Sequence, residues 1–334
     1  MDSQRREARR EHARRRESAR RRRRRTLAGL SLLLAAGAVA AVALASVGGG
    51  GGGGGGRAFP PASRGARAGG VTRAGTAGSA RTASHSTVTG AATGRPGSTR
   101  VPILMYHVIN PPPPGAPFPG LYVSASEFSA QMQALAEAGY HAITQDQMWA
   151  YWKRGVPLPA GKPIVLSFDN GYQSQYSNAL PVLRRLGWVG DENIQLTGLP
   201  PSEGGLSDSQ VRGLVAAGWE LDTQGVSHAD LIALSVTQLA VQVAGARKTI
   251  QRRYGVPVNW FCYPSGHYDA TVIAAVKSAG YTGSTTVVPG WAGPDSDPYR
   301  LPRLRVLGDT SPEALLSELQ AIRSDPAPPA SYSG

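Results

Sequence analysis

Cysteine is almost absent from the 334-residue sequence, which contains only Cys262. A single cysteine excludes a disulfide within the chain, so the protein is not a small secreted domain held together by disulfides. Cys262 stands in the apolar stretch 260–263, and no neighbouring base is evident in the sequence. A role as nucleophile is disfavoured, because a reactive thiol needs surroundings that stabilise the thiolate.

Acidic residues are scarce in the first hundred positions. Residues 1–25 contain 13 Arg and 4 acidic residues, and residues 57–100 contain 7 Arg and no acidic residue. From residue 101 to the end, 15 Lys and Arg are present with 18 Asp and Glu. The formal net charge of +13 therefore comes from the N-terminal part, and no nucleic-acid groove is indicated on the remainder.

Charge of either sign is absent from residues 26–47, TLAGLSLLLAAGAVAAVALASV. These 22 residues are enough for a helix to cross about 30 Å of hydrocarbon. The arginines before this run favour a cytoplasmic N-terminus and an extracytoplasmic C-terminal part. We predict an Arg-rich cytoplasmic tail over 1–25 and a single-pass signal anchor in the cell membrane over 26–47. Secretion after cleavage near Ala45 is the alternative.

Bulky apolar residues are rare after the predicted anchor, where nine consecutive glycines open a segment rich in Gly, Ala, Ser, Thr and Arg. Such a segment has too little apolar surface to bury, so residues 48–100 are predicted to be a disordered linker. Residues 324–334 are predicted to be a disordered C-terminus. The folded domain is predicted over residues 101–323.

Strand-like and helix-like segments alternate through this domain. Strand candidates lie over 101–106, 141–144, 163–168, 193–197, 219–224, 259–263, 281–288 and 303–307. Ser124 with Glu127, Asp208 and Asp269 predict helix N-termini. Repeated strand–helix units indicate an α/β fold with a mostly parallel sheet, closed as a barrel or open. Functional residues are then expected at the C-terminal ends of the strands.

Polar residues follow three of the strand candidates. The first group is Asp169 and Asn170, the second contains Gln224 and His228, and the third contains Ser265. Taken alone, an Asp-Asn pair after a strand is usually a turn former, and a single loop histidine is usually structural. The three groups together, in this order, indicate a functional site.

The chain resembles the polysaccharide deacetylases with the NodB homology domain, of the carbohydrate esterase 4 type. The resemblance covers roughly residues 100–308, in the segments VPILMYHVI, IVLSFDNGY…NALPVLRRLG, AAGWELDTQGVSHADL, FCYPSGHYD and YRLPRLRV. It implies a distorted (β/α) barrel of about seven parallel strands. It also implies a hydrolase of carbon–nitrogen bonds other than peptide bonds, acting on N-acetylated glycans.

The resemblance assigns roles to the strand-end residues. Asp169 aligns with the catalytic base, and Asn170 with a metal-binding Asp. Gln224 and His228 align with two metal-binding histidines. Ser265 aligns with the position whose backbone N–H faces the oxyanion.

Two further positions depart from the family pattern. Cys262 stands where the family has an Arg that orients the base. No histidine follows His267, although many relatives use a late histidine as general acid.

A catalytic zinc site needs about three protein ligands and an open position for water. Asn170 and Gln224 offer only weak amide oxygens. Asp222 lies on the same side of its strand as Gln224, and an Asp169, Asp222 and His228 set would suit a divalent ion. The alternative for Asp222 is a structural acid that accepts backbone hydrogen bonds. One prediction is therefore a divalent metal, Zn²⁺ or similar, bound by His228, Asp222, Asn170 and Gln224. The alternative is that no metal binds.

Other residues are candidates for contact with a glycan. His107 ends the first strand and is predicted to line the site, with packing as the alternative. Tyr172, Tyr263 and Trp291 have rings that suit sugar faces. Trp291, in the loop PGWAGPDSDPY, is predicted to be an exposed platform.

Two functions stay open. The first is an envelope-anchored hydrolase in which Asp169 activates water, His228 with Asp222 holds a metal or a water, and the N–H near Ser265 stabilises the oxyanion. The second is a catalytically silent relative that binds glycan or scaffolds an envelope complex. Glycan and, through the N-terminal helix, membrane are the expected partners, and nucleic acid is not. The sequence does not specify the sugar or the oligomeric state.

Overall fold

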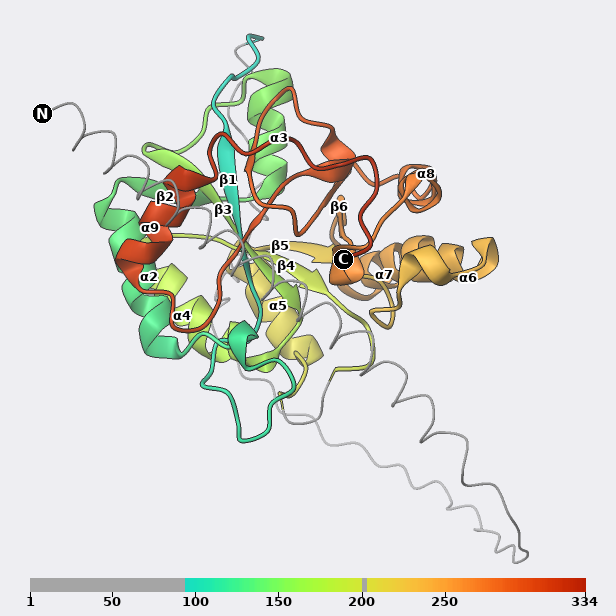
Figure 1. Ribbon diagram of the computed structural model, residues 1–334, viewed down its shortest axis with the longest axis horizontal. Helices are drawn as coiled ribbons and strands as arrows, with labels where there is room; N and C mark the ends of the chain where they lie inside the picture. The colour runs from blue at the N-terminus through green and yellow to red at the C-terminus, as the bar shows by residue number, and fades with distance from the viewer. Residues whose placement is uncertain (1–93, 200–202) are drawn as a thin grey trace, which may run out of the picture. The chain divides into compact units, whose positions relative to one another are not determined.

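The computed structural model describes residues 94–199 and 203–334 (Figure 1). The predicted tail, signal anchor and most of the predicted linker lie outside the described residues. Within the described ranges, no helix combines the length and the apolar character that a membrane span requires. The signal anchor therefore stays a prediction.

A nine-stranded sheet forms the centre of the domain, in the order β7-β6-β5-β4-β3-β1-β8, with β2 beside β3 and β9 beside β1. The strands are β1 (Val101–Tyr106), β2 (Tyr140–Ile143), β3 (Lys162–Asn170), β4 (Asp191–Ile194), β5 (Glu220–Thr223), β6 (Trp260–Cys262), β7 (Gly283–Thr285), β8 (Trp291–Ala292) and β9 (Leu304–Arg305). Strands β1 to β7 run parallel, and β8 is antiparallel to β1. The predicted α/β fold is confirmed as a half-barrel of seven parallel strands.

Residues 301–305 connect β7 to β1. Leu301 forms a parallel bridge with Thr285 at the end of β7, and β9 pairs with β1 through Leu104 and Met105. This crossing segment carries Arg303 into the interior of the half-barrel, where it is fully buried. The half-barrel is therefore completed by a short segment near the end of the domain.

Eight α-helices connect or cover the strands in the described ranges. They are α2 (Ala125–Glu137), α3 (Gln145–Arg154), α4 (Leu180–Leu186), α5 (Asp208–Ala216), α6 (Val236–Ala240), α7 (Ala246–Tyr254), α8 (Ala270–Ser278) and α9 (Pro312–Ala321). Ser124 and Asp269 cap α2 and α8 as predicted. Helix α5 is capped by Ser207 rather than Asp208, because the Ser207 hydroxyl accepts the Gln210 N–H.

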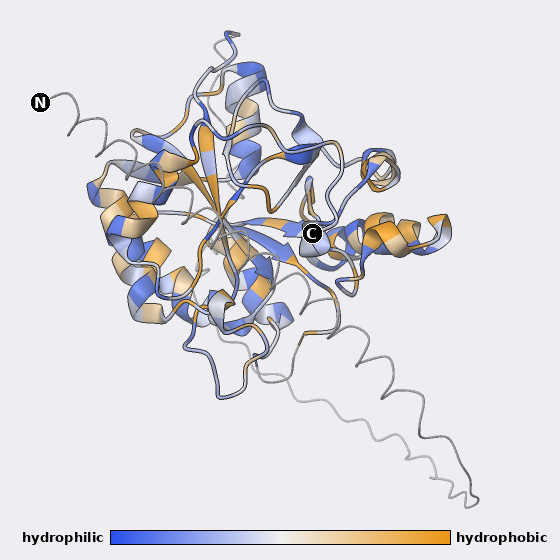
Figure 2. Ribbon diagram, in the orientation of Figure 1, coloured by the Kyte–Doolittle hydropathy of each residue, from blue (hydrophilic) through white to orange (hydrophobic). Residues whose placement is uncertain are grey.

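Side chains alternate between the two faces of β3, and this alternation separates the core from the site. Phe168 points outward and stacks on Trp219 with ring centroids 4.8 Å apart. Ser167 and Asp169 point inward to Arg303. Figure 2 shows apolar residues along β1 and β3, whereas β4 and β5 are largely hydrophilic. The interior of the half-barrel is consequently polar.

The C-terminal residues differ from the predicted disorder over 324–334. Tyr332 and Tyr268 exchange two backbone hydrogen bonds of 2.8 and 2.9 Å. The Tyr268 hydroxyl donates to the Pro329 carbonyl, and Arg300 donates to the Pro328 carbonyl. The tail is held mainly by backbone groups, which a composition-based prediction of disorder does not detect.

Candidate functional site

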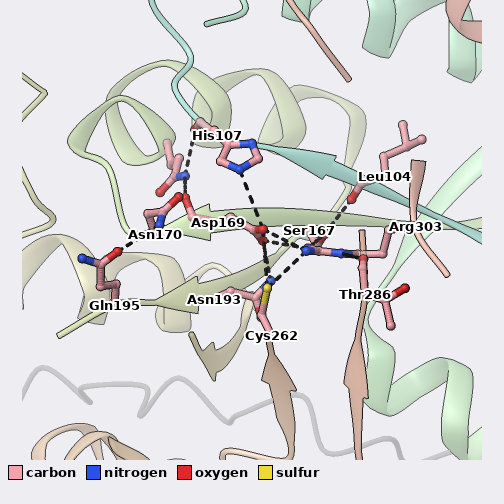
Figure 3. Close-up of polar contacts among 11 residues, drawn as sticks. Leu104, His107, Ser167, Asp169, Asn170, Asn193, Gln195, Cys262, Thr286 and Arg303 are labelled. Atoms are coloured by element: carbon pink, nitrogen blue, oxygen red, sulfur yellow. Dashed lines mark hydrogen bonds and ion pairs between the residues drawn. The ribbon is translucent and has the colours of Figure 1, made fainter. Parts of the chain in front are cut away.

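Asp169, at the C-terminal end of β3, is the centre of the site (Figure 3). Its Oδ1 accepts hydrogen bonds from Arg303 Nη1 at 2.7 Å and Asn193 Nδ2 at 2.9 Å. Its Oδ2 accepts from Arg303 Nη2 at 2.9 Å and from Cys262 Sγ at 3.4 Å. A carboxylate has about four lone-pair positions, so these donors occupy all of them. The side chain is 1% exposed.

The ion pair fixes the charge of both partners. Burial alone raises the pKa of Asp169, but the charge and hydrogen bonds of Arg303 outweigh burial and lower the pKa to about 2. Burial alone lowers the pKa of Arg303, and the charge of Asp169 outweighs it, so that pKa is raised. Asp169 and Arg303 are therefore both ionised at neutral pH.

Arg303 uses all five of its N–H donors. Besides Asp169 and Cys262, the guanidinium donates to Ser167 Oγ and, through Nε, to the Thr286 carbonyl. Ser167 in turn donates to the Leu104 carbonyl at 2.6 Å. Arg303 therefore ties three segments of the half-barrel together.

Cys262 lies where the resemblance places the base-orienting Arg of the family. Its Sγ lies 3.2 Å from Arg303 Nη2, so the guanidinium arrives from the crossing segment instead of from β6. Burial raises the pKa of the Cys262 thiol above its ordinary value. The thiol is therefore neutral, which is consistent with the expectation that it is no nucleophile.

Three of the four predicted metal ligands, Asn170, Gln224 and His228, lie at or after the C-terminal ends of their strands, as Asp169 does. Asn170 has a left-handed backbone (φ 81), and its Nδ2 donates to Gln195 Oε1 at 2.9 Å. Gln224 is buried, and its Oε1 has no hydrogen-bond partner among the described residues. His228 is half-buried and has a left-handed φ of 53. Burial lowers the pKa of His228, and Asp169 partly opposes this effect.

These residues do not fit a divalent cation. The set offers two neutral amide oxygens and one imidazole, and the oxygens of Asp169 are already occupied. No group of three or more His, Cys, Asp and Glu residues suited to a metal ion occurs within residues 94–199 and 203–334. Metal sites in proteins rely on imidazole, thiolate and carboxylate ligands.

The structure places Asp222 away from the predicted ligand set. Its Oδ1 accepts the backbone N–H groups of Asn259 and Trp260 at 3.1 and 2.8 Å, near the start of β6. The charges of Asp191 and Asp146 act on it, rather than those of Asp169 and His228. The relocated site is therefore corrected: Asp222 is a structural acid, because its carboxylate satisfies backbone N–H groups.

Two predicted residues lie beside Asp169. His107 Nε2 lies 4.0 Å from Asp169 Oδ2. Burial lowers the pKa of His107 to about 3, so its ring is neutral at pH 7. Tyr172 is half-buried; burial, with the charges of Glu203 and Asp169, raises its pKa to about 12.

Ser265 lies in a short 3₁₀ turn (Pro264–Gly266) directly after β6 and has a left-handed φ of 55. Gly266 packs closely against Val287, since a Cβ at this position would lie 2.3 Å from Val287 Cγ2. The glycine of the Pro-Ser-Gly pattern therefore has a steric reason. The role of the Ser265 N–H stays a prediction.

Two predicted sugar platforms are wrong. Trp291 is 8% exposed and donates its indole N–H to the Leu319 carbonyl in α9. It forms the short strand β8 beside β1, and the Arg323 guanidinium lies 5.1 Å from the centre of its ring. Tyr263 is completely buried and donates its hydroxyl to the Tyr299 carbonyl. Neither ring can face a glycan.

Sequence reasoning missed four residues that shape the site: Asn193, Gln195, Arg303 and Arg305. The signal for the arginines was present, since two charged residues interrupt the apolar strand candidate 303–307. Asn193 and Gln195 are two residues apart in the segment DENIQL, so their side chains lie on the same side of the strand.

The structure is that of a parallel α/β half-barrel protein whose polar site lies at the C-terminal ends of its strands. Residues 158–284 match the family model described as polysaccharide deacetylase. The YxkH protein of Bacillus subtilis (strain 168) is 26% identical over 67% of this chain and 77% of its own length. A poly-β-1,6-N-acetyl-D-glucosamine N-deacetylase of Escherichia coli (strain K12) is 38% identical over 20% of this chain and 10% of its own length.

Two solved structures share the fold. The Streptococcus pyogenes deacetylase PplD, in complex with acetate, has a TM-score of 0.61 and 26% identity, covering 67% of this chain and 99% of that one. The polysaccharide deacetylase BC0361 of Bacillus cereus has a TM-score of 0.59 and 27% identity, covering 66% of this chain and 69% of that one. Residues 158–284 therefore form a polysaccharide deacetylase domain of the NodB type, and the low identities to these relatives are those of a divergent member.

Proposed function

We propose that this chain binds N-acetylated glycan of the cell envelope at the strand-end site and hydrolyses the amide bond slowly or not at all. The observation that supports this most directly is the Asp169 carboxylate, whose lone pairs are all occupied. A water molecule would have to displace one of these donors before Asp169 could take its proton.

The pKa of Asp169 leads to the same proposal. General bases work best when their pKa lies near the working pH. With a pKa of about 2, Asp169 has little tendency to accept a proton at pH 7. In this proposal the ion pair holds the strand ends together and leaves binding to the groups around it.

The polar groups near Asp169 suit a carbohydrate. His107 lies 4.0 Å from Asp169, the charge of Asp169 acts on Tyr172, and the buried Gln224 Oε1 and His107 Nδ1 have no hydrogen-bond partners among the described residues. Buried polar atoms without partners are costly, and hydroxyl and N-acetyl groups of a glycan would satisfy them. In this proposal the site lies on the outer side of the cell membrane, because residues 26–47 are predicted to anchor the chain with its C-terminal part outside.

Hydrolysis is the second candidate, and one observation favours it. Arg303 supplies the guanidinium that Cys262 lacks, so an ionised and oriented carboxylate is retained at the position of the family's base. Asp169 would then activate water, with His228 positioning it and the Ser265 N–H facing the oxyanion.

Acetate release from chitooligosaccharides and peptidoglycan decides between the two, with retention of labelled glycan measured in parallel. We expect retention without release by the wild type, with and without added Zn²⁺, and no release by Asp169→Asn, whose folding is checked by circular dichroism because Arg303 loses its partner. Release that Asp169→Asn abolishes would overturn the proposal in favour of hydrolysis. Absence of both release and retention would contradict glycan binding itself.

A further inference from the structure

A second arginine lies near the Asp169–Arg303 pair. Arg305 is two residues after Arg303 in the crossing segment, so both side chains point to the same side of the strand. In β9 it pairs with Met105 of β1, one step closer to the C-terminal ends of the strands than Leu304. Arg305 therefore lies at the strand-end site rather than in the outer core.

Among residues 94–199 and 203–334, the Arg305 guanidinium has no hydrogen-bond or ion-pair partner. Its Nε is buried without a hydrogen-bond acceptor, and no ion pair of this side chain is found within the described ranges. Arg303, by contrast, uses every donor. A guanidinium stays charged in proteins, so Arg305 brings a positive charge with an unused donor to the site.

Within the part of the chain that the structure describes, no carboxylate whose charge acts on Arg305 is free to balance it. Asp169 is the nearby carboxylate, and Arg303 already neutralises it. Asp230 pairs with His267 at 3.0 Å, and Glu203 accepts a hydrogen bond from Tyr122. The other groups whose charges act on Arg305 are the Tyr332 phenol and the Cys262 thiol, both weak acids.

His107 completes the arrangement. Its Nδ1 is buried without a partner, and Arg305 is among the groups whose charge acts on this ring. A neutral imidazole can donate one N–H to an oxygen, which would lie beside the guanidinium. His107 comes two residues after Met105, the β1 partner of Arg305, so these two polar groups without partners lie on the same side of neighbouring strand ends.

We propose that the strand-end site binds an acidic glycan, with a carboxylate or phosphate group of the glycan against Arg305 and His107. This inference rests on the proposed glycan binding and names the class of ligand. Guanidinium groups match both oxyanions with two parallel hydrogen bonds. A neutral N-acetylated oligosaccharide leaves the charge of Arg305 unbalanced, whereas an oxyanion balances it.

Calorimetric titration of the full chain in detergent micelles tests the inference. The probes are a glucuronate-containing oligosaccharide, a phosphorylated oligosaccharide and a neutral chitooligosaccharide, each matched in length. We expect at least one acidic probe to bind about tenfold more tightly than the neutral one. We expect Arg305→Gln to reduce this ratio to about one, and Arg305→Lys to retain part of it. The acidic probe that binds more tightly identifies the source of the oxyanion.

The control variant is Arg252→Gln, which removes the same charge from an exposed position of α7 and should leave the ratio unchanged. Circular dichroism establishes that each variant is folded. Equal binding of acidic and neutral probes by the wild type, or a preference unchanged by Arg305→Gln, overturns the inference while glycan binding stands. Free glucuronate or inorganic phosphate that binds through Arg305 without any glycan binding would overturn glycan binding and keep the anion site. Binding of no probe overturns both.

Discussion

The buried pair of Asp169 and Arg303 dominates the energetics at the scale of single residues. Taking two charges out of water is expensive, and their attraction offsets the expense only when both partners are present. Removing one partner leaves the other charged and buried. The pair therefore maintains the ends of the strands, whether or not Asp169 takes part in chemistry.

We expect Arg303→Met to lower the free energy of unfolding by about 3–5 kcal/mol, because Asp169 would stay buried without its partner. Urea unfolding followed by circular dichroism measures the loss. The exposed pair Arg253–Asp208, with 2.6 Å between Nη2 and Oδ1, provides a matched control in Arg253→Met. A much smaller change is expected there, because solvent screens an exposed pair. Equal losses in the two variants would contradict the importance given to Asp169–Arg303.

Individual residues also mark the limit of what the sequence could predict. Asp169 and His107 were assigned to the site from motifs, and the structure places them 4.0 Å apart. Arg303 was not assigned, because a charged residue in a short apolar segment can point inward or outward and the sequence does not say which. Trp291 shows the reverse error, since its polar loop favoured exposure while α9 covers it.

At the scale of elements, the start of α3 meets the ends of β4 and β5 opposite to the site. Asp191 Oδ2 and Glu220 Oε2 accept the backbone N–H groups of Gln145 and Asp146, each at 2.9 Å. These are the unpaired N–H groups of the first helical turn, where negative charge is favourable. The carboxylates of the sheet thus close one end of the half-barrel against a helix N-terminus.

This acidic end holds more carboxyl groups than donors. Asp191 Oδ1, Glu220 Oε1 and Asp222 Oδ2 have no hydrogen-bond partners among the described residues. Asp146 also lies nearby and accepts from Trp260 Nε1 and Asn259 Nδ2. Burial, followed by the charges of these acids on one another, raises the pKa values of Asp191, Glu220 and Asp222. The folded state therefore holds protons that the unfolded state releases.

We expect the stability contributed by this acidic end to fall as the pH rises from about 4 upward, while His107 and His228, whose pKa values burial lowers, act in the opposite direction below about pH 6.5. A raised pKa in the folded state means that the unfolded chain loses its protons first. Asp222→Asn keeps the acceptor for the N–H groups of Asn259 and Trp260 and removes one ionisable group. The variant should be more stable than the wild type at pH 8 and should show a weaker pH dependence, measured by urea unfolding from pH 5 to 8.

The control for this series is Asp295→Asn, because the Asp295 side chain is 76% exposed. It should follow the wild-type pH profile. A stability difference between Asp222→Asn and the wild type that stays constant from pH 5 to pH 8 would contradict the raised pKa of Asp222.

Element boundaries were largely predictable, and their exceptions have physical reasons. The capping residues Ser124 and Asp269 could be read from the sequence because a short polar side chain before an apolar periodic run satisfies free N–H groups. At α5, Ser207 and Asp208 are both suitable, and the sequence alone did not distinguish them. Strand β3 runs on through Asn170, because Asp169 and Asn170 pair with Asn193 and Ile194 of β4.

At the scale of the whole described domain, the two ends of the half-barrel have opposite electrostatic character. One end has buried carboxyl groups against α3, and the other has Arg303 and Arg305 with a single neutralised carboxylate. The net acidic charge of residues 101–334 gives no sign of this division. It arises because inward-facing residues of β4 and β5 are acids and those of the crossing segment are arginines.

The C-terminal tail contributes to the stability of this domain. A chain ending at Asp325 loses the two backbone hydrogen bonds of Tyr332 with Tyr268 and the contacts of Pro328 and Pro329. The entropy regained by the tail offsets part of the loss, so we expect destabilisation by about 1 kcal/mol. For a domain of this size the melting temperature should fall by about 2–4 °C.

Differential scanning calorimetry of the truncated and full chains measures this change. A full-length Tyr332→Ala variant keeps the backbone pairing and serves as the control for the side chain. An unchanged melting temperature in the truncated chain would show that the tail contacts add nothing to stability.

The crossing segment also determines when the domain can be completed during synthesis. Asp169 and Arg303 are 134 residues apart in the sequence. A ribosome must therefore add most of the domain after Asp169 before the partner of that carboxylate exists. Contacts over such separations form late, because a long loop has to close first. Until residue 303 has emerged, the ends of the strands carry an unpaired charge, so the nascent chain keeps its future site open to water.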